Sequence, residues 1–132
     1  MKKKILIVMA DYYENISQGL LHNTKKVLQE QFDLISVPGV FEIPVTIAKN
    51  IKKYDGFIAL GCVIKGETPH FDLISKAAID GIMKLSIEYK KPIGNGIITC
   101  LNLKQAIARQ KKGQEAAAAL LSVLNPVKVS AE

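Results

Sequence analysis

The sequence predicts an α/β fold built as a three-layer sandwich, with helices on both faces of a four-stranded parallel sheet. Short apolar runs alternate with segments that carry apolar residues at helical spacing, and the pair occurs four times along the chain. Such an order is typical of parallel strands joined by right-handed helical crossovers. The length of 132 residues suits one domain, so we expect residues 1–132 to fold as a single unit.

The first half of the chain predicts two strands and two helices. Residues 5–9 are wholly apolar, which suits a strand buried on both faces. Helical spacing begins at Ile16, and Phe32–Val37 follows as a second strand that ends in a Pro-Gly turn. Residues 40–51 return to helical spacing, and Pro44 fits only in the first turn of that helix.

The second half repeats this pattern. Residues 57–64 are the most apolar run and predict the third strand. Thr68 and Pro69 predict a helix start, a capping hydroxyl followed by proline at the first helical position, and this helix should run to about Tyr89. Residues 92–99 predict the fourth strand, although the Gly-Asn-Gly at its centre is weak for one.

The last stretch predicts two helices, residues 103–110 and 114–124, separated by a break at Gly113. The complete order is that of flavodoxin-like folds, in which ligands bind at the carboxyl ends of the strands. Four stretches therefore qualify as parts of a site: residues 10–15, 38–42, 61–70 and 99–102.

The composition favours a small anionic ligand over nucleic acid. The net charge is +6, from 18 basic and 12 acidic residues, but the lysines are dispersed. A nucleic-acid surface needs clustered basic residues with stacking aromatics, so we expect no nucleic-acid partner, whereas long-range attraction still favours small anions. Since no apolar run approaches the ~20 residues that span a bilayer, we also expect no membrane partner and a cytoplasmic location.

The two cysteines do not predict a disulfide or a metal site. Cys62 and Cys100 are far apart along the chain and have neither C-x-x-C spacing nor a histidine cluster nearby. Their apolar surroundings predict reduced, buried side chains. We therefore expect no metal.

Residues 61–70 carry the strongest candidate chemistry. Gly61 and Gly66 allow a close approach of the backbone to a ligand, and amides at the following helix start attract anions. Thr68 either caps the helix or binds a phosphate oxygen. His70 is expected in the first turn, where the positive end of the helix dipole favours a neutral, basic imidazole suited to proton transfer. The alternative is a helix cap followed by a surface histidine without a catalytic role.

Two other stretches offer aromatic rings. Residues 38–42 combine open amides with the Phe41 ring and the Glu42 carboxylate, or form only a turn with an acid at the helix start. Tyr12 and Tyr13 follow the first strand, where they either stack on a planar ring or cover the edge of the core.

Two polar residues come later in the chain. Arg109, the only arginine, is either a surface residue or a phosphate ligand. Asn95, between two glycines, marks a bend, a bulge or a ligand contact. These residues together predict a planar aromatic ligand, a phosphate and a base between them, but they do not name the reaction.

Three segments match long motifs of a known family. Residues 37–44 read Val-Pro-Gly-Val-Phe-Glu-Ile-Pro, residues 59–72 read Ala-Leu-Gly-Cys-Val-Ile-Lys-Gly-Glu-Thr-Pro-His-Phe-Asp, and residues 105–109 read Gln-Ala-Ile-Ala-Arg. They resemble V-P-G-A-F-E-I-P, A-L-G-x-V-I-R-G-x-T-x-H-x-D and Q-A-I-E-R of the 6,7-dimethyl-8-ribityllumazine synthase family. The similarity in order and spacing covers nearly the whole chain.

The resemblance implies a reaction. The family condenses 5-amino-6-ribitylaminouracil with 3,4-dihydroxy-2-butanone 4-phosphate in riboflavin biosynthesis, and it releases phosphate and two waters. It uses no metal or organic cofactor, and its sites lie between the subunits of a pentamer. The resemblance therefore implies a transferase with two small-molecule substrates that forms a homo-oligomer, a pentamer or a multiple of one.

The resemblance also implies residues for the pyrimidine substrate. Tyr12 takes the place of an aromatic ring that stacks on the pyrimidine. Val40, Phe41 and Glu42 line the pyrimidine and ribityl pocket, with Glu42 accepting hydrogen bonds from ribityl hydroxyls. The residues that hold the ring edge are Cys62, Val63 and Ile64.

A second group is implied for the phosphate and for proton transfer. Glu67 and Thr68 offer backbone amides and a hydroxyl to the phosphate, and His70 shuttles protons. Arg109 binds the phosphate from a neighbouring subunit.

The sequence departs from the family pattern at several points. Asn95, counted among the substrate-binding residues, stands where many members have a phenylalanine over the pyrimidine. Glu67 replaces a small residue beside the phosphate, and Lys65 replaces an arginine without supplying its bidentate fork. The loop after Arg109 is several residues shorter, and the extra strand that many members have at the N-terminus is missing.

These departures keep a second hypothesis open beside an active synthase: a catalytically weak relative that binds pyrimidines or flavins or forms a shell. A signalling receiver domain shares the fold order and has an acid after the first strand, as Asp11 is here. Such domains need a phosphoacceptor aspartate at the end of the third strand, where this chain has Gly61 and Cys62. The receiver hypothesis is therefore rejected.

Overall fold

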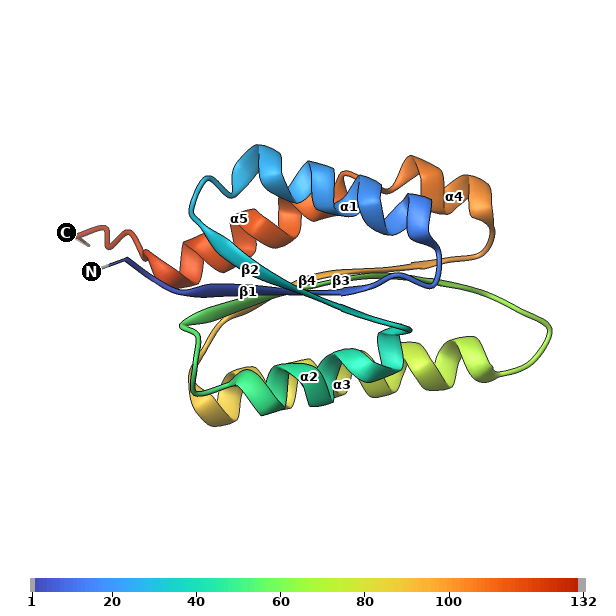
Figure 1. The fold of residues 1–132 in the computed structure, drawn as a ribbon, viewed down its shortest axis with the longest axis horizontal. Coiled ribbons are helices and arrows are strands. Elements are labelled where there is room, and N and C mark those ends of the chain that lie inside the picture. Colours follow the sequence, from blue (N-terminus) through green and yellow to red (C-terminus); the bar gives the residue numbers. More distant parts are fainter. Residues whose placement is uncertain (1, 131–132) are drawn as a thin grey trace.

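The computed structural model describes residues 2–130 of the chain (Figure 1). Residues 1, 131 and 132, which the single-domain expectation also includes, lie outside the described part. The described residues alternate strands and helices in the predicted order. The elements are β1 (Ile5–Ala10), α1 (Glu14–Val27), β2 (Phe32–Val37), η1 (Val40–Glu42), α2 (Ile43–Asn50), β3 (Gly56–Ile64), α3 (His70–Tyr89), β4 (Ile93–Cys100), α4 (Leu103–Ala108) and α5 (Lys112–Leu124).

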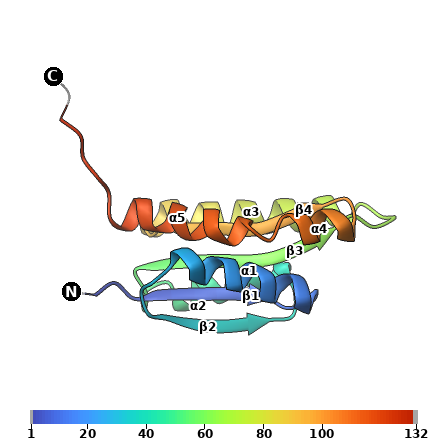
Figure 2. The same cartoon turned by 90° about the horizontal axis from the view of Figure 1, so that it is seen from above.

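The four strands form one parallel sheet in the order β2-β1-β3-β4. Helices α1, α4 and α5 cover one face and α2 and α3 cover the other, which gives three layers (Figure 1 and Figure 2). The predicted three-layer sandwich with flavodoxin-like order is confirmed.

The two central strands are apolar along their whole length because both of their faces are covered. Alternate side chains of β1 enter two separate cores: Ile7 and Met9 pack with α1 and α5, whereas Leu6 and Val8 pack with α2 and α3. The side chains of β3 also alternate between the two cores. Each fully buried aliphatic side chain contributes about 1.5–3 kcal/mol of transfer free energy to folding. The edge strand β2 is less covered, and Asp33 and Ser36 are exposed there.

Most helix boundaries agree with the sequence prediction within two residues. Pro44 lies in the first turn of α2, as expected, but the single-turn helix η1 precedes it. The capping position of α3 is Pro69, one residue later than predicted, and its N-cap makes no side-chain hydrogen bond. Thr68 Oγ1 instead accepts a long bond of 3.4 Å from the amide of His70.

The predicted helix break at Gly113 is wrong. Gly113 lies inside α5, and a Cβ atom there would overlap the carbonyl oxygen of Leu20 in α1. Thr24 Oγ1 also donates to the carbonyl of Gly113 at 3.2 Å. The glycine is therefore required by the close approach of two helices. Gly94 allows the same approach of α5 to β4, because a Cβ there would meet the backbone of Ala116.

The longest helix, α3, leaves part of its apolar surface uncovered. Leu73, Met83 and Ile87 are all more than half exposed and lie near one side of the helix by their spacing. Within residues 2–130, no helix is long and apolar enough to cross a membrane. The exposed side of α3 is thus an apolar surface without a partner in the described chain.

Candidate functional site

The carboxyl ends of the parallel strands meet at one edge of the sheet, and the predicted site residues follow them. Tyr12 comes after β1, residues 40–42 come after β2, and residues 67–70 come after β3. η1 packs against α3 and the strands β1 and β3, so the second group lies beside the helix that the third group begins. The fold therefore brings most of the predicted site residues to one edge of the sheet from segments far apart in the sequence.

Val40 fixes the position of the segment after β2. Its side chain is buried, and it lies over Gly61, where a Cβ atom would come within 2.7 Å of Val40 Cγ2. Gly61 thus makes room for Val40, and the expectation that it serves close ligand approach is corrected. Because Val40 is anchored, Phe41 remains 59% exposed and the half-buried Glu42 stays at the surface beside it.

The two tyrosines after β1 lie in different environments. The sequence left open whether they stack on a planar ring or cover the edge of the core. Tyr13 packs against the core beneath α1, and desolvation, followed by the influence of Tyr12 and Cys62, raises its pKa. Tyr12 is 76% exposed and meets Tyr13 edge-to-face, with ring centroids 4.9 Å apart. Tyr13 covers the core, and Tyr12 presents a free ring face.

The end of β3 contributes an apolar wall. Cys62 and Ile64 lie on the side of α1, and Val63 lies on the side of α3, because strand residues alternate between faces. Burial first, and then the neighbouring Cys100, raise the pKa of the Cys62 thiol to about 12. Within residues 2–130, no three His, Cys, Asp or Glu side chains gather closely enough to hold a metal ion.

The segment between β3 and α3 is open. The amide of Lys65 still donates to the carbonyl of Cys100 at 2.8 Å, but residues 65–70 are all exposed. A Cβ atom at Gly66 would meet nothing within 4 Å. Glu67 and Thr68 therefore have space around them, and the carboxylate of Glu67 can point away from an anion bound at the helix start.

His70 is the first residue of α3 and is exposed. No hydrogen bond joins its imidazole to another residue within the range 2–130. An exposed imidazole needs no protein partner, so this geometry fits both alternatives from the sequence, the proton-transfer group and the surface histidine. The amides of the first helical turn lie beside it and attract negative charge.

Arg109 lies at the outer margin of the sheet. It follows α4, and its guanidinium donates to the carbonyl of Thr99 at 3.1 Å. Together with Lys111 and Lys112 it lines a depression of about 460 Å³ beside β4. Lys112 pairs with Glu115 at 3.8 Å, whereas Arg109 and Lys111 form no ion pair within residues 2–130.

Comparison with known proteins identifies the family. A model of the 6,7-dimethyl-8-ribityllumazine synthase family matches residues 2–128. The chain belongs to this family. Among its relatives is the 6,7-dimethyl-8-ribityllumazine synthase of Bartonella bacilliformis, 45% identical over 118 residues, which are 84% of this chain and 78% of that protein. The synthase of Agrobacterium fabrum is 41% identical over 138 residues and 93% of both chains. That of Bartonella tribocorum is 43% identical over 94% of this chain and 91% of its own.

Asn95, like Arg109, lies apart from the predicted site residues that follow β1, β2 and β3. It is the third residue of β4 and pairs with Ala59, well before the carboxyl ends of the strands. Its Oδ1 atom accepts a bond of 3.0 Å from the amide of Ile97. Within one chain, Asn95 therefore supports β4 and does not join the other residues.

Two polar residues near the site were not predicted. Asp11 Oδ2 accepts a hydrogen bond of 2.7 Å from Ser36 Oγ, which ties the ends of β1 and β2 together. The position of Asp11 directly after an apolar run was the available signal. Ser75, in the second turn of α3, has a buried hydroxyl with no partner within the described range 2–130, and no sequence pattern indicates it.

Proposed function

We propose that this chain catalyses the condensation of 5-amino-6-ribitylaminouracil with 3,4-dihydroxy-2-butanone 4-phosphate to 6,7-dimethyl-8-ribityllumazine, the reaction of its family in riboflavin biosynthesis. The observation that carries the proposal is the family match over residues 2–128, which spans every predicted site residue from Tyr12 to Arg109. The synthases of Bartonella and Agrobacterium support the same activity by their names and extensive identity.

His70 moves protons in this proposal. Imine formation between the amine and the ketone, elimination of phosphate and ring closure each transfer protons at carbon, nitrogen or oxygen. The open imidazole at the start of α3 can give and take those protons beside an anion site. Thr68 and the backbone at Glu67 hold the phosphate, since both have free space and lie next to the first-turn amides.

The pyrimidine occupies the other side of the site. Tyr12 and Phe41 supply exposed aromatic faces, and the half-buried Glu42 accepts hydrogen bonds from ribityl hydroxyls. The ring edge rests on the end of β3, where Cys62 and Ile64 lie on the α1 side of the sheet and Val63 lies on the α3 side.

The complete site includes a second copy of the chain. Arg109 binds a neighbour's phosphate in this proposal; it lies at the outer edge of β4, and Asn95 lies on the same strand. The uncovered apolar side of α3 supplies surface for association. We therefore include in the proposal a homopentamer or a multiple of one, made of single-domain chains spanning residues 1–132 that act in the cytoplasm without metal or cofactor.

A weaker relative that binds pyrimidines or flavins, or that forms a shell, is the second candidate. Asn95, in place of an aromatic ring, and Glu67, beside the phosphate position, favour it. Both substrates are mixed with the protein and the fluorescence of the product is followed against the spontaneous reaction. A rate above background supports the synthase, and no gain over background rejects it in favour of the binding protein. The native mass tests the pentamer separately.

A further inference from the structure

The two outer strands of the sheet differ in how their outward backbone groups are satisfied. On β4, the amide of Ile97 donates to Asn95 Oδ1 and the carbonyl of Thr99 accepts from Arg109. Since the carbonyl of Cys100 accepts from Lys65 on the β3 side, Ile97 and Thr99 are outward residues. Side chains therefore already occupy part of the edge at β4.

The edge at β2 is open. The carbonyl of Val37 accepts from the amide of Asp11, so Val37, Ile35 and Asp33 direct their backbone groups toward β1. The backbone groups of the alternate residues, Phe32, Leu34 and Ser36, point outward. β1 is the only strand that pairs with β2 within residues 2–130. An open edge of this kind is a template for another strand.

The segment after α5 has the form of such a strand. Pro126 prevents the helix from continuing, and residues 125–130 run away from the body of the molecule (Figure 1 and Figure 2). Val127 and Val129 are 88% and 87% exposed, with Lys128 between them. This alternation of β-branched and polar residues is typical of a strand with one apolar face.

We infer that residues 126–130, the C-terminal segment, add as a fifth strand to the open edge of β2 in a second copy of the chain. The two partners match face by face. Phe32 and the 43% exposed Leu34 lie on one face of β2, and the exposed Asp33 lies on the other. A register that places Val127 and Val129 beside Leu34 places Lys128 on the face of Asp33, where their charges attract each other.

The same copy cannot supply this strand. Leu124 lies against Gly56, the first residue of β3, so the segment starts two strands away from the β2 edge. The outer side of β2 is about 14 Å from β3 at a strand spacing of about 4.8 Å. The three residues from Leu124 to Val127 span at most about 11 Å, which is less than this distance.

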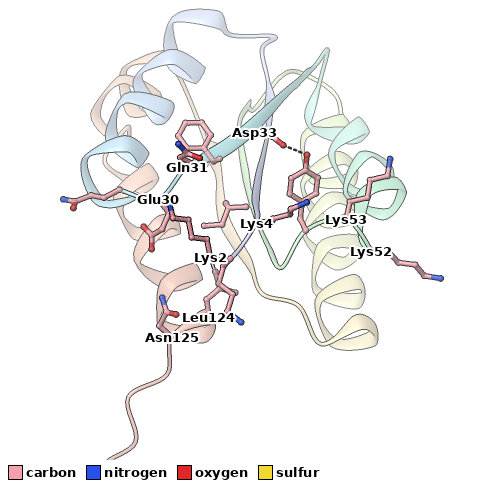
Figure 3. Close-up of a pocket in the computed structure, with 14 residues that line it drawn as sticks. Lys2, Lys4, Glu30, Gln31, Asp33, Lys52, Lys53, Leu124 and Asn125 are labelled. Atoms are coloured by element: carbon pink, nitrogen blue, oxygen red, sulfur yellow. Dashed lines mark hydrogen bonds between the residues drawn. The ribbon is translucent and has the colours of Figure 1, made fainter.

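The start of β2 borders an open depression. A depression of about 1370 Å³ opens at the amino ends of the strands, bordered by Phe32, Asp33 and Asn125 (Figure 3). Lysines of the N-terminal segment and of residues 52–53 surround it. A free anion is the alternative ligand for this depression, and the amide-exchange experiment below distinguishes it from the segment of a second copy.

Cross-linking between copies tests the register. The double variant Leu34→Cys with Val127→Cys is oxidised mildly and run on a non-reducing gel. We expect a ladder of linked dimers and larger species, because each segment reaches a neighbour's β2. The matched control pairs Leu34→Cys with Lys128→Cys, which has the same reach but the opposite face, and should link several-fold less. Equal linking in both variants, or monomers carrying an internal disulfide, would overturn the inference.

Amide exchange gives a second readout in the otherwise native chain. In the double variant Val127→Lys with Val129→Lys, the outward amides of Leu34 and Ser36 should exchange about tenfold faster than in the natural chain. The inward amide of Ile35 should not change. An unchanged rate at Leu34, or an effect reproduced by adding inorganic phosphate to the natural chain, would mean that the edge has no strand from a second copy.

Discussion

The carboxyl and amino ends of the parallel strands differ in their residues and in the size of the depression beside them. The carboxyl end carries Tyr12, Phe41, Thr68 and His70 on separate segments, and the depression beside the end of β4 measures about 460 Å³. The amino end has the larger depression, about 1370 Å³, but its border is made of lysines and loop residues (Figure 3). Cavity size in a single chain therefore does not locate the chemistry.

Strand direction explains the difference. The helix that follows each strand begins at the carboxyl end, so free amides and positive dipole ends face that edge. At the amino end the helices finish, and cations there complement the negative ends of the dipoles, as Lys52 and Lys53 do after α2. Two acids at this end already have hydrogen-bond partners, since Tyr54 donates to Asp33 at 2.6 Å and the amide of Lys4 donates to Asp55 at 2.7 Å.

The largest expected effect concerns the thiol at the carboxyl end. Burial raises the pKa of Cys62 from 9.0 to about 12, so its thiolate at pH 8 should be about 1000-fold scarcer than that of an ordinary cysteine. We expect labelling by a thiol reagent to be slowed by at least that factor and to rise steadily up to pH 11. The protein unfolded in denaturant is the control. Fast labelling at pH 8 would show that Cys62 is a reactive thiol and would contradict its burial among apolar groups.

The second effect concerns proton transfer. Replacing His70 with alanine should lower kcat on the order of 100-fold, because it removes the proposed proton shuttle but leaves the helix start intact. His22→Ala, at an exposed position on α1, is the matched control and should keep full activity. A change in KM for the phosphorylated substrate without a change in kcat would assign His70 to binding.

The third effect tests whether the site extends across copies. Arg109→Ala should raise KM for the phosphorylated substrate about tenfold, as expected for the loss of a charge-assisted contact, with a smaller change in kcat. Lys104→Ala, an exposed cation on α4, is the control. An unchanged KM would show that the phosphate is held by one chain alone.

The smallest effect is expected at the amino end. The double variant Lys52→Ala with Lys53→Ala should keep kcat and KM within about twofold of the natural chain, since screened surface charges act weakly on a distant site. A larger change in kcat or KM in steady-state assays would contradict the contrast between the two ends, because it would show that the amino end takes part in the reaction.

The sequence predicted the fold well where local patterns and tertiary contacts agree. The apolar runs of β1 and β3 identified strands buried on both faces, and the place of Pro44 in α2 was correct. Gly113 misled, because a glycine needed for close packing against α1 looks the same in sequence as a helix break. The contact that decides between the two is 93 residues away, at Leu20.

The site was predicted from motifs, and its remaining parts depend on contacts that no local pattern contains. The separate roles of Tyr12 and Tyr13 follow from how α1 packs on the sheet. Asn95 bonds its own strand, which the Gly-Asn-Gly pattern left undecided. The lysines of the amino end are dispersed in sequence and meet only because residues 2–4 and 52–53 adjoin the same end of the sheet.

The seat of Val40 over Gly61 limits how substrates enter. Because this side chain is locked into the core, the segment that carries Phe41 and Glu42 forms a fixed wall and cannot swing aside as a lid. Freedom to admit and release a ligand then rests with residues 65–69 across the site, where the backbone is exposed and Gly66 has open space. In the proposed site, the phosphate side is therefore the part with room to move, whereas the pyrimidine side keeps a fixed shape.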